Sequence, residues 1–574
     1  MNELTALWTS GAIPPGALLI LGGVAVALGP RALRPVFVLG FPVAALAAVW
    51  QVPDGVSLSA PFLDFTLELV KGDKLSRLFG TIFALMALLG GLFALNQRSG
   101  TELAAAFIYA GCALGVVFSG DLLSVFIFWE MMAIASGVVI WSAGTEAARA
   151  SALRYYLVHF LGGVLLMVGI IGLLNDTGDL TFRVMQLESA WTWLILAGFL
   201  INAGAPPLSA WIGDAYPEAS WSGTVFLSAF TTKTAVYVLL RGFPGAEILI
   251  FVGLYMIFYG IIYALLENDM RRILAYSIVN QVGFMVCAIG LGSPELGGTL
   301  ALNGAASHAF AHIIYKALLL MSAGAVLYMT GRRKCSDLGG LFRTMPVTTI
   351  CGIIGALSIS AFPLTSGFVT KSMINDAAAG AHLMIVWMLL TAASAGVFLH
   401  AGIKFPWFVF FQKDSGLRPP DPPWNMKLAM ILMSALCIGI GVYPAPLYEI
   451  LPFEVDYVPY TAAHVTKLTQ LLLFSGLAFF LLLPLMKRTE TITLDFDWFY
   501  RTAGPALLRW GGRVLGRTGG RLEGLTARAG DAGVRLLMGL AGERGTLSQT
   551  LRAGGAILIV TLALSIALAL TLTS

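Results

Sequence analysis

The sequence is poor in charge. Only 11% of its 574 residues are charged and 58% are hydrophobic, whereas about 25% are charged in a typical soluble domain. A globule of this size with so few charges cannot cover its surface with polar groups. The composition therefore excludes a cytosolic enzyme, a disordered or fibrous protein and a nucleic-acid-binding protein. It indicates a polytopic membrane protein.

Cysteine is also scarce, and the first apolar run is not expected to be a signal peptide. The five cysteines lie far apart with no CxxC spacing: Cys112, Cys287, Cys335, Cys351 and Cys437. A structural zinc site, an iron–sulfur cluster or a disulfide framework is therefore not expected, and no cofactor is predicted. Residues 1–14 contain no Lys or Arg, so the first apolar run lacks the basic region of a signal peptide.

The sequence is rich in long apolar runs. Runs of about 20 apolar residues predict membrane-spanning helices. We predict sixteen: 13–30, 33–52, 75–95, 102–120, 121–143, 152–174, 190–211, 219–241, 246–265, 271–291, 297–327, 344–379, 382–403, 425–443, 466–486 and 555–573.

The basic residues predict the orientation of these spans. Of the 35 Lys and Arg residues, 26 fall in loops after odd-numbered spans or in the segment 489–553. Because basic loops stay in the cytoplasm, we expect both termini outside and the basic segment 489–553 in the cytoplasm. We expect the membrane to be a bacterial inner membrane.

Two spans five apart contain similar proline-bearing segments. Ala205-Pro206-Pro207-Leu208 lies in span 7, and Ala361-Phe362-Pro363-Leu364 lies in span 12. Proline removes a backbone hydrogen bond, so we expect helix breaks at Pro206, Pro207 and Pro363. An odd separation gives the two units opposite membrane orientation, and paired broken helices in inverted repeats are typical of transporters. An ordinary proline kink is the alternative.

These features predict an all-α polytopic membrane protein with two inverted five-helix repeats, broken helices and a cytoplasmic amphipathic arm. The predicted organisation is spans 1–3 (1–95), a first repeat (96–245), a second repeat (246–411), spans 14–15 (412–488), the arm (489–553) and a last span (554–574). In the arm, arginines spaced by four and seven interleave with apolar residues, as in interfacial helices. Its many glycines leave open that the helix is broken into pieces.

Ionisable residues inside the predicted spans are functional candidates, because a charge near the bilayer centre costs roughly 2.5 kcal/mol or more. Glu130 is near the middle of span 5, and Lys233 is deep in span 8. A protonated, hydrogen-bonded Glu130 and a structural ion pair of Lys233 are the alternatives to proton transfer. Lys371 follows the break in span 12 and is a candidate for proton exchange with water outside, or for snorkelling.

Span 11 places three basic residues on one helix face. His308, His312 and Lys316 are spaced by four, which predicts a proton relay about 12 Å long. The His-x-x-x-His pair also admits a metal, but a lysine one turn away disfavours it and no metal site is predicted. His159 and His400 are interpreted as packing residues, and Asp214 as a helix cap or hinge.

These motifs resemble the antiporter-like membrane subunits shared by respiratory complex I and Mrp-type multisubunit cation/proton antiporters. The resemblance rests on Trp129-Glu130, the turn Trp211–Ala219, Thr231–Thr234, Leu274–Ser277, His308–Lys316 and Leu364–Lys371. It implies fourteen core helices, two linked proton half-channels and a chain of charged residues at mid-membrane. The C-terminal Phe496–Tyr500, the arm and the last span resemble the largest such subunits, which carry a lateral helix along neighbouring subunits. Among Mrp antiporters, the chain resembles subunits D and A.

One position departs from this pattern. The family places a lysine in the span 7 break as partner of the span 5 glutamate, and the aligned residue here is Asn202; Ser209 replaces a usual histidine. Asn202 cannot carry a proton charge, so the first half-channel is expected to be altered. The second keeps its titratable groups.

Three functions remain open at this point. The first is a proton- and cation-translocating subunit of an Mrp-type antiporter, exchanging sodium or potassium. The second is a proton-pumping membrane subunit of an NADH dehydrogenase-like or hydrogenase-like complex, in which any redox chemistry belongs to other subunits. The third is a non-conducting scaffold. In each, the arm and outer spans contact other membrane subunits and the lipid bilayer, and no nucleic acid is bound.

Overall fold

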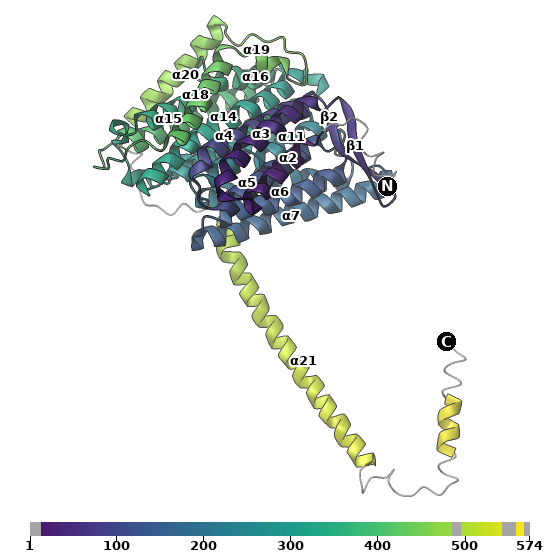
Figure 1. Cartoon of the computed structure of the whole chain (residues 1–574). Helices are drawn as coiled ribbons and strands as arrows, with labels where there is room; N and C mark the ends of the chain where they lie inside the picture. Colours follow the sequence, from purple (N-terminus) through teal and green to yellow (C-terminus); the bar gives the residue numbers. More distant parts are fainter. Residues whose placement is uncertain (1–12, 485–494, 542–557, 567–574) are drawn as a thin grey trace. The chain divides into compact units, whose positions relative to one another are not determined.

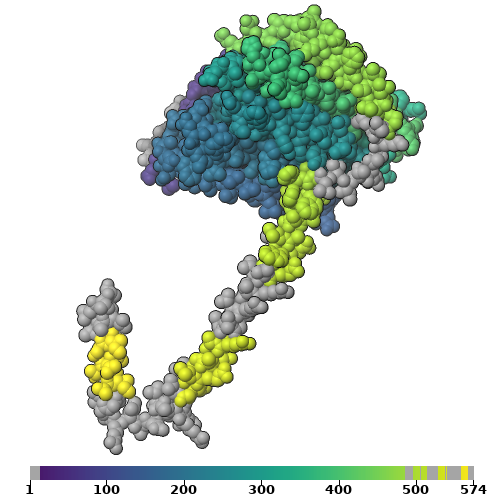
Figure 2. Space-filling model, turned by 180° about the vertical axis from the view of Figure 1, so that it is seen from behind, coloured from purple at the N-terminus to yellow at the C-terminus, as the bar shows by residue number. Residues whose placement is uncertain are grey.

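The computed structural model describes residues 13–484, 495–541 and 558–566. It divides into two units, one ending at Asp497 and one beginning at Trp498, and each is described by itself. The first unit is a bundle of helices with one β-hairpin (Figure 1). Figure 2 shows one face of this unit, much of which the middle of its sequence covers in blue and teal.

The N-terminal part of the first unit runs to Thr177. Its helices are α2 (Pro15–Leu28), α3 (Arg34–Gln51), α4 (Lys74–Phe93), α5 (Gly100–Phe118), α6 (Leu122–Trp141) and α7 (Glu146–Thr177). Side chains of Asp73, Ser99, Asp121 and Thr145 cap α4 to α7 in that order, as polar N-cap residues do.

The middle of the chain contains two interrupted spans. It comprises α8 (Ala190–Ala203), α9 (Ala210–Ala215), α10 (Gly223–Leu227), α11 (Thr231–Gly242), α12 (Ile248–Leu266), α13 (Met270–Gly290) and α14 (Thr299–Thr330). A six-residue gap holding Pro206 and Pro207 separates α8 from α9. A shorter gap separates α10 from α11.

The last part of the first unit contains a third interruption. It comprises α15 (Pro346–Ile359), α16 (Ser366–Gly380), α17 (Met384–Val397), α18 (Trp424–Val442), α19 (Ala445–Glu449) and α20 (Ala462–Leu481). The gap between α15 and α16 holds Pro363. After α17 the chain continues in two π-helical segments, η7 (Phe398–Lys404) and η8 (Trp407–Phe411).

The predicted helical membrane fold is confirmed. Twelve helices within the described residues are long and apolar enough to cross a bilayer, and three shorter apolar helices are α2, α8 and α15. Together they match the first fifteen predicted spans. The sixteenth, 555–573, lies largely outside the described residues, of which 558–566 are helical.

A β-hairpin is an element that the sequence analysis did not predict. Strands β1 (Gly55–Phe62) and β2 (Phe65–Gly72) pair antiparallel, from Gly55 opposite Gly72 to Phe62 opposite Phe65. Its hydrogen bonds satisfy backbone groups in the connection between α3 and α4. The backbone N–H of Glu68 donates to the carboxylate of Asp121 at 2.7 Å, so the hairpin is attached to the beginning of α6.

Helix α14 lies at the centre of the first unit. It packs against α4, α10, α11, α13, α15, α16 and α18, and Figure 1 shows it near α4, α15 and α18. Nearly all of its residues from Ala301 to Val326 are buried. A helix that is buried all round presents every face to other helices, so polar groups on α14 meet protein and not lipid.

The first unit ends in a short segment fixed by a buried carboxylate. Asp495 accepts hydrogen bonds from the hydroxyls of Tyr259 on α12 and Tyr276 on α13, each at 2.6 Å for its shorter contact. Burial raises the pKa of the Asp495 carboxyl, because desolvation penalises the charged form. The segment that leads into the arm is therefore attached to α12 and α13.

The second unit contains one long helix. After a π-helical turn, η9 (Phe499–Ala503), α21 runs without interruption from Gly504 to Ala541. The many glycines left open that this helix is broken into pieces, but it is continuous over this range. A glycine keeps its backbone hydrogen-bonding groups, and its cost relative to alanine is only about 1 kcal/mol. The rest of the predicted arm, 489–494 and 542–553, lies outside the described residues.

Candidate ion-translocation site

The three basic residues of α14 lie within the first unit and face its interior. His308, His312 and Lys316 are fully buried. Lys233 on α11 and Lys371 on α16 are also buried, and both helices pack against α14. The structure thus gathers five of the six residues singled out in the spans around one central helix.

His308 is held by hydrogen bonds from two neighbouring helices, α16 and α13. Its Nδ1 is 3.1 Å from the hydroxyl of Thr370 on α16, and its Nε2 is 3.1 Å from the amide oxygen of Gln281 on α13. The hydroxyl of Tyr315 donates to the same amide oxygen at 3.2 Å. Both ring nitrogens therefore have partners, so a proton at His308 has a defined neighbour on each side.

His312 has no such partners. Neither ring nitrogen forms a hydrogen bond with the described part of the chain, although both are buried. Its ring centroid is 6.3 Å from that of His308 and 5.2 Å from that of Tyr315. His312 also lies within range of the charges of Lys233 and Lys316. An unpartnered buried imidazole between basic groups is placed to accept a proton from either side.

The three lysines are satisfied by backbone carbonyls. The Nζ of Lys371 donates to the carbonyl of Ile359, the last residue of α15, at 3.0 Å. The Nζ of Lys316 donates to the carbonyl of Leu274 at 3.3 Å. That of Lys233 donates to the carbonyl of Ser228, in the gap between α10 and α11. Two of these carbonyls are available because a helix is interrupted there.

None of the three lysines forms an ion pair with a carboxylate of the described residues. Buried charges without counter-ions are costly, and like charges oppose one another in a low dielectric. The lysines and histidines around α14 therefore cannot all carry a proton at once. An arrangement of this kind favours movement of a small number of protons along the set.

Glu130 lies apart from this cluster. It is half-buried on α6, and its Oε1 is buried without a hydrogen-bond partner among the described residues. A methyl group added at Gly163 would lie 2.0 Å from that oxygen, so Glu130 packs against the glycine surface of α7. No described cation pairs with it.

Asn202 is fully buried in the last turn of α8. Within the described residues, neither its amide nitrogen nor its amide oxygen forms a hydrogen bond, and the hydroxyl of Ser209 is likewise unpartnered. The carbonyl of neighbouring Ile201 accepts a hydrogen bond from the indole N–H of Trp211 at 2.9 Å. The two polar side chains beside the first break, those of Asn202 and Ser209, therefore cannot exchange a proton as a lysine or histidine would.

Several polar residues of the site were missed by sequence reasoning. Gln281, Thr370 and Tyr315 complete the surroundings of His308. An amide in the otherwise apolar run of α13 was a detectable signal. The hydroxyls gave none, because Thr and Tyr are common in buried helices.

Asp214 requires a correction. It lies within α9, and the guanidinium of Arg154 on α7 donates to both its carboxylate oxygens at 2.7 and 2.8 Å. It is therefore the partner of a bidentate ion pair and not a helix cap. His159 and His400 each donate to the carbonyl four residues earlier, at 3.0 and 2.8 Å. In the described residues there is no cluster of three or more His, Cys, Asp or Glu that could hold a metal ion.

Comparison with known proteins points to one family. The profile of the family described as NADH:quinone oxidoreductase/Mrp antiporter, transmembrane region, matches residues 119–397. The D subunit of a Na(+)/H(+) antiporter from Alkalihalophilus pseudofirmus is 28% identical over 431 residues, which cover 70% of this chain and 83% of that protein. The A/B subunit of a probable K(+)/H(+) antiporter from Rhizobium meliloti is 28% identical over 414 residues, 67% of this chain but only 40% of the relative.

Two solved structures share the fold. A chain of the Mrp complex from Dietzia sp. DQ12-45-1b matches with a TM-score of 0.74 at 21% identity, over 97% of this chain and 62% of that one. A chain of the membrane-bound sulfane sulfur reductase, an archaeal respiratory membrane complex, matches with a TM-score of 0.70 at 22% identity, over 97% of this chain and 99% of that one. The resemblance predicted from the sequence is confirmed: this chain is a multi-span membrane protein with the fold of the antiporter-like subunits of Mrp antiporters and complex I.

Proposed function

We propose that this chain is the proton- and cation-translocating subunit of a multisubunit Mrp-type cation/proton antiporter. The observation that carries the proposal is the buried set of basic residues around α14, which has no described carboxylate as counter-ion. Such a set is expensive to maintain, and burial of this kind marks proton and ion pathways in membrane proteins. The antiporter subunits among its relatives support the same function.

The proposed path runs along the second half of the molecule. Protons pass between Lys316 and His312, then to His308, whose Nδ1 contacts the hydroxyl of Thr370. Lys371 follows Thr370 in the sequence and ends the path beside the break between α15 and α16. The freed carbonyl of Ile359 stabilises the protonated lysine. When Lys371 loses its proton, the ammonium charge disappears and the path can be loaded again from the other end.

Of the candidate residues in the first half, only Lys233 is proposed to influence the proton path. Lys233 lies within range of the charges of His312 and Lys316, so its protonation state acts on the path through electrostatics. Asn202 cannot exchange a proton. Glu130 has no described cation beside it, so desolvation favours its neutral form. On this proposal the first half-channel does not switch.

The setting is proposed from the positive-inside rule and from the relatives. The chain lies in a bacterial inner membrane with its termini outside, and α21 lies along the cytoplasmic surface against neighbouring subunits. The exposed Arg509, Arg513 and Arg528 of α21 fit contact with anionic headgroups or with acidic surfaces of those subunits.

A second candidate is a proton-pumping subunit of a redox-driven complex. The observation that favours it is length, because the respiratory-complex chain is covered to 99% whereas the Mrp chain is covered to 62%. The same path then moves protons, and electron transfer in other subunits drives it.

Purification of the native complex and its reconstitution into vesicles test these candidates together. The antiporter proposal expects a sodium or potassium gradient to drive proton movement without an electron donor, with Lys371→Ala abolishing it. Iron–sulfur subunits in the complex, and proton movement only with an electron donor, would support the second candidate. Vesicles in which neither driving force moves protons would leave the chain as a scaffold and refute both.

A further inference from the structure

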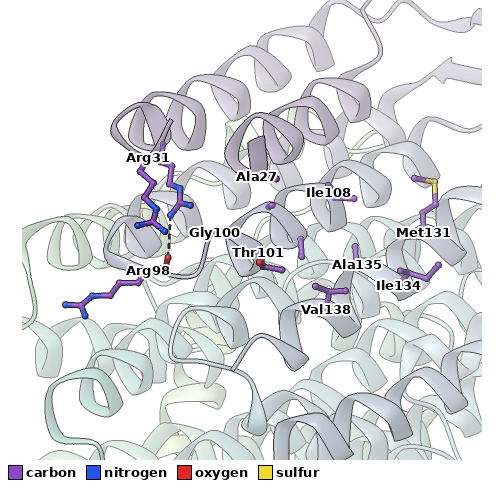
Figure 3. Close-up of a pocket in the computed structure, with 13 residues that line it drawn as sticks. Ala27, Arg31, Arg98, Gly100, Thr101, Ile108, Met131, Ile134, Ala135 and Val138 are labelled. Atoms are coloured by element: carbon purple, nitrogen blue, oxygen red, sulfur yellow. Dashed lines mark hydrogen bonds between the residues drawn. The ribbon is translucent and has the colours of Figure 1, made fainter. Parts of the chain in front are cut away.

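A groove on the surface of the bundle lies between α2, α5 and α6. Its volume is 690 Å³, and most of its lining is apolar. Figure 3 shows Arg31 and Arg98 at one end, and Met131 and Ile134 toward the other. The side chains of Met131 and Ile134 are 39% and 49% exposed. The groove is thus accessible from outside the protein, and one end differs in charge from the other.

The basic end consists of Arg31, Arg34 and Arg98. None of the three forms an ion pair with a carboxylate of the described residues. The Nη1 of Arg34 donates to the carbonyl of Arg98 at 3.4 Å, and its Nε is buried without a partner. Three guanidinium groups that lack an anion form a site with unused donors.

The backbone around α5 shapes this end. A methyl group added at Gly100 would lie 2.3 Å from the Nη2 of Arg34, so glycine leaves the space that the guanidinium occupies. Gly100 also begins α5, and the positive end of the helix dipole favours an anion there. The nearest acidic side chain of that turn, Glu102, is turned away and accepts hydrogen bonds from Ser220 and Ser222.

The remainder of the groove fits a hydrocarbon chain. Small side chains of Thr101, Ala104 and Ala135 form part of it, which leaves a channel beside the larger Ile108 and Met131. From Gly100 to Ile108, α5 rises about 12 Å. One leaflet of the hydrocarbon core is roughly 15 Å thick, so the groove extends over most of one leaflet. By the positive-inside rule that leaflet is the cytoplasmic one.

We propose that this groove binds an anionic phospholipid, with its phosphate at Arg31, Arg34 and Arg98 and one acyl chain along α5 and α6. Charge complementarity selects this occupant, since an uncharged helix of a neighbouring subunit would leave the three guanidinium groups without an anion. The inference rests on the membrane location alone and not on the proposed ion translocation. Its failure and that of the proposed function are therefore separate results.

The test measures phospholipid bound to the full chain, purified with its co-purifying subunits, by native mass spectrometry and by thermal unfolding with added phosphatidylglycerol or phosphatidylcholine. The wild type is expected to retain and be stabilised by phosphatidylglycerol preferentially. The triple variant Arg31→Gln/Arg34→Gln/Arg98→Gln is expected to lose this preference, since each basic residue near a membrane surface contributes about fivefold in affinity. The matched control Arg149→Gln/Arg332→Gln/Lys413→Gln removes the same charge from exposed positions and is expected to keep it.

A second pair of variants tests the acyl-chain part. Thr101→Trp fills the groove at an exposed position and is expected to reduce bound phosphatidylglycerol at least twofold, whereas Leu157→Trp on the exposed surface of α7 is expected to have no effect. Equal lipid preference in the wild type and the arginine triple variant would overturn the proposal. So would equal losses in both triple variants, an effect of the arginines without an effect of Thr101→Trp, or a complex that retains no phospholipid because a subunit fills the groove.

Discussion

The two proline-bearing breaks, between α8 and α9 and between α15 and α16, differ in the side chain that donates a hydrogen bond to a backbone carbonyl. Each interruption frees a carbonyl near the end of its first helix. At the first break the carbonyl of Ile201 accepts a hydrogen bond from the indole of Trp211 at 2.9 Å. At the second, the carbonyl of Ile359 accepts one from the ammonium of Lys371 at 3.0 Å. The indole keeps its proton at every physiological pH, whereas the ammonium can release one.

This difference separates a structural break from one that can take part in proton transfer. Around the second break, the hydroxyl of Thr370, the residue before Lys371, contacts His308. Around the first, the side chains of Asn202 and Ser209 make no described hydrogen bond. Sites with titratable groups in low dielectric can respond to proton movement, and sites with neutral amides cannot. The comparison supports the proposal that the second half, and not the first, moves protons.

The largest expected effect is the loss of Lys371. Lys371→Ala removes the group at the end of the path and leaves the carbonyl of Ile359 unsatisfied, so we expect proton flux in reconstituted vesicles to be abolished. Lys316→Ala should do the same from the other end. Lys413→Ala, at an exposed position, is the control. Unchanged flux in either path variant would remove the second half from the mechanism.

A partial loss is expected when Thr370 can no longer contact His308. Thr370→Val keeps the shape and deletes the hydroxyl, which contributes about 1 kcal/mol, so flux should fall roughly five- to tenfold. Thr234→Val is the matched control, because the hydroxyl of Thr234 is buried without a described partner. Flux is measured with a pH-sensitive dye in vesicles. Equal behaviour of the two variants would contradict a role for the Thr370–His308 contact.

At the first break the expected effect is on stability and not on flux. Trp211→Phe removes the indole donor to the carbonyl of Ile201, which then keeps only the backbone N–H of Gly204 at 3.1 Å. Loss of one such hydrogen bond costs about 1 kcal/mol. Trp129→Phe is the matched control, since Trp129 is equally buried and its indole N–H has no described partner. Thermal unfolding in detergent should show the larger loss for Trp211→Phe. Flux lost beyond what reduced stability explains would give the first break a direct role.

A smaller effect concerns the backbone of the two breaks. The first turns through Gly204 at φ 80°, whereas the second places Ala361 at φ 56° and Leu364 at φ 68°. A residue other than glycine pays about 1 kcal/mol there. Ala361→Gly is therefore expected to leave stability unchanged or raise it slightly. Gly204→Ala should lower it, because the added methyl group would also lie 2.6 Å from Ile212. The reverse order of melting temperatures would show that the second break is not strained.

The sequence predicts much of this comparison, for identifiable reasons. Long apolar runs determine the spans, and prolines such as Pro363 inside a run mark where a helix is interrupted. Spacing by four places His308 and His312 on one face. The substitution at Asn202 is visible because a charged residue is expected there and is missing.

What the sequence could not provide depends on contacts between distant segments. Gln281 on α13 and Thr370 on α16 are far from His308 in the sequence, and only packing brings both to it. The hairpin of β1 and β2 escaped prediction because an irregularity of pairing between Val56 and Ser59 disturbs its alternation. Arg154 and Asp214 are 60 residues apart, so no local sequence pattern predicts their ion pair.

The smallest expected effect is that of Glu130→Gln. Glu130 has no described cation beside it. Asn202 occupies the position at which the family resemblance predicts the partner lysine of Glu130. On the proposal that desolvation keeps the Glu130 carboxyl neutral, a neutral glutamine changes little at this position, and flux should change little. The alternative is that Lys233 moves to pair with Glu130, in which case Glu130→Gln and Lys233→Ala should be equally severe. Measuring both beside Lys371→Ala decides between these possibilities. An inactive Glu130→Gln complex that still folds and assembles would show that the first half-channel switches despite Asn202.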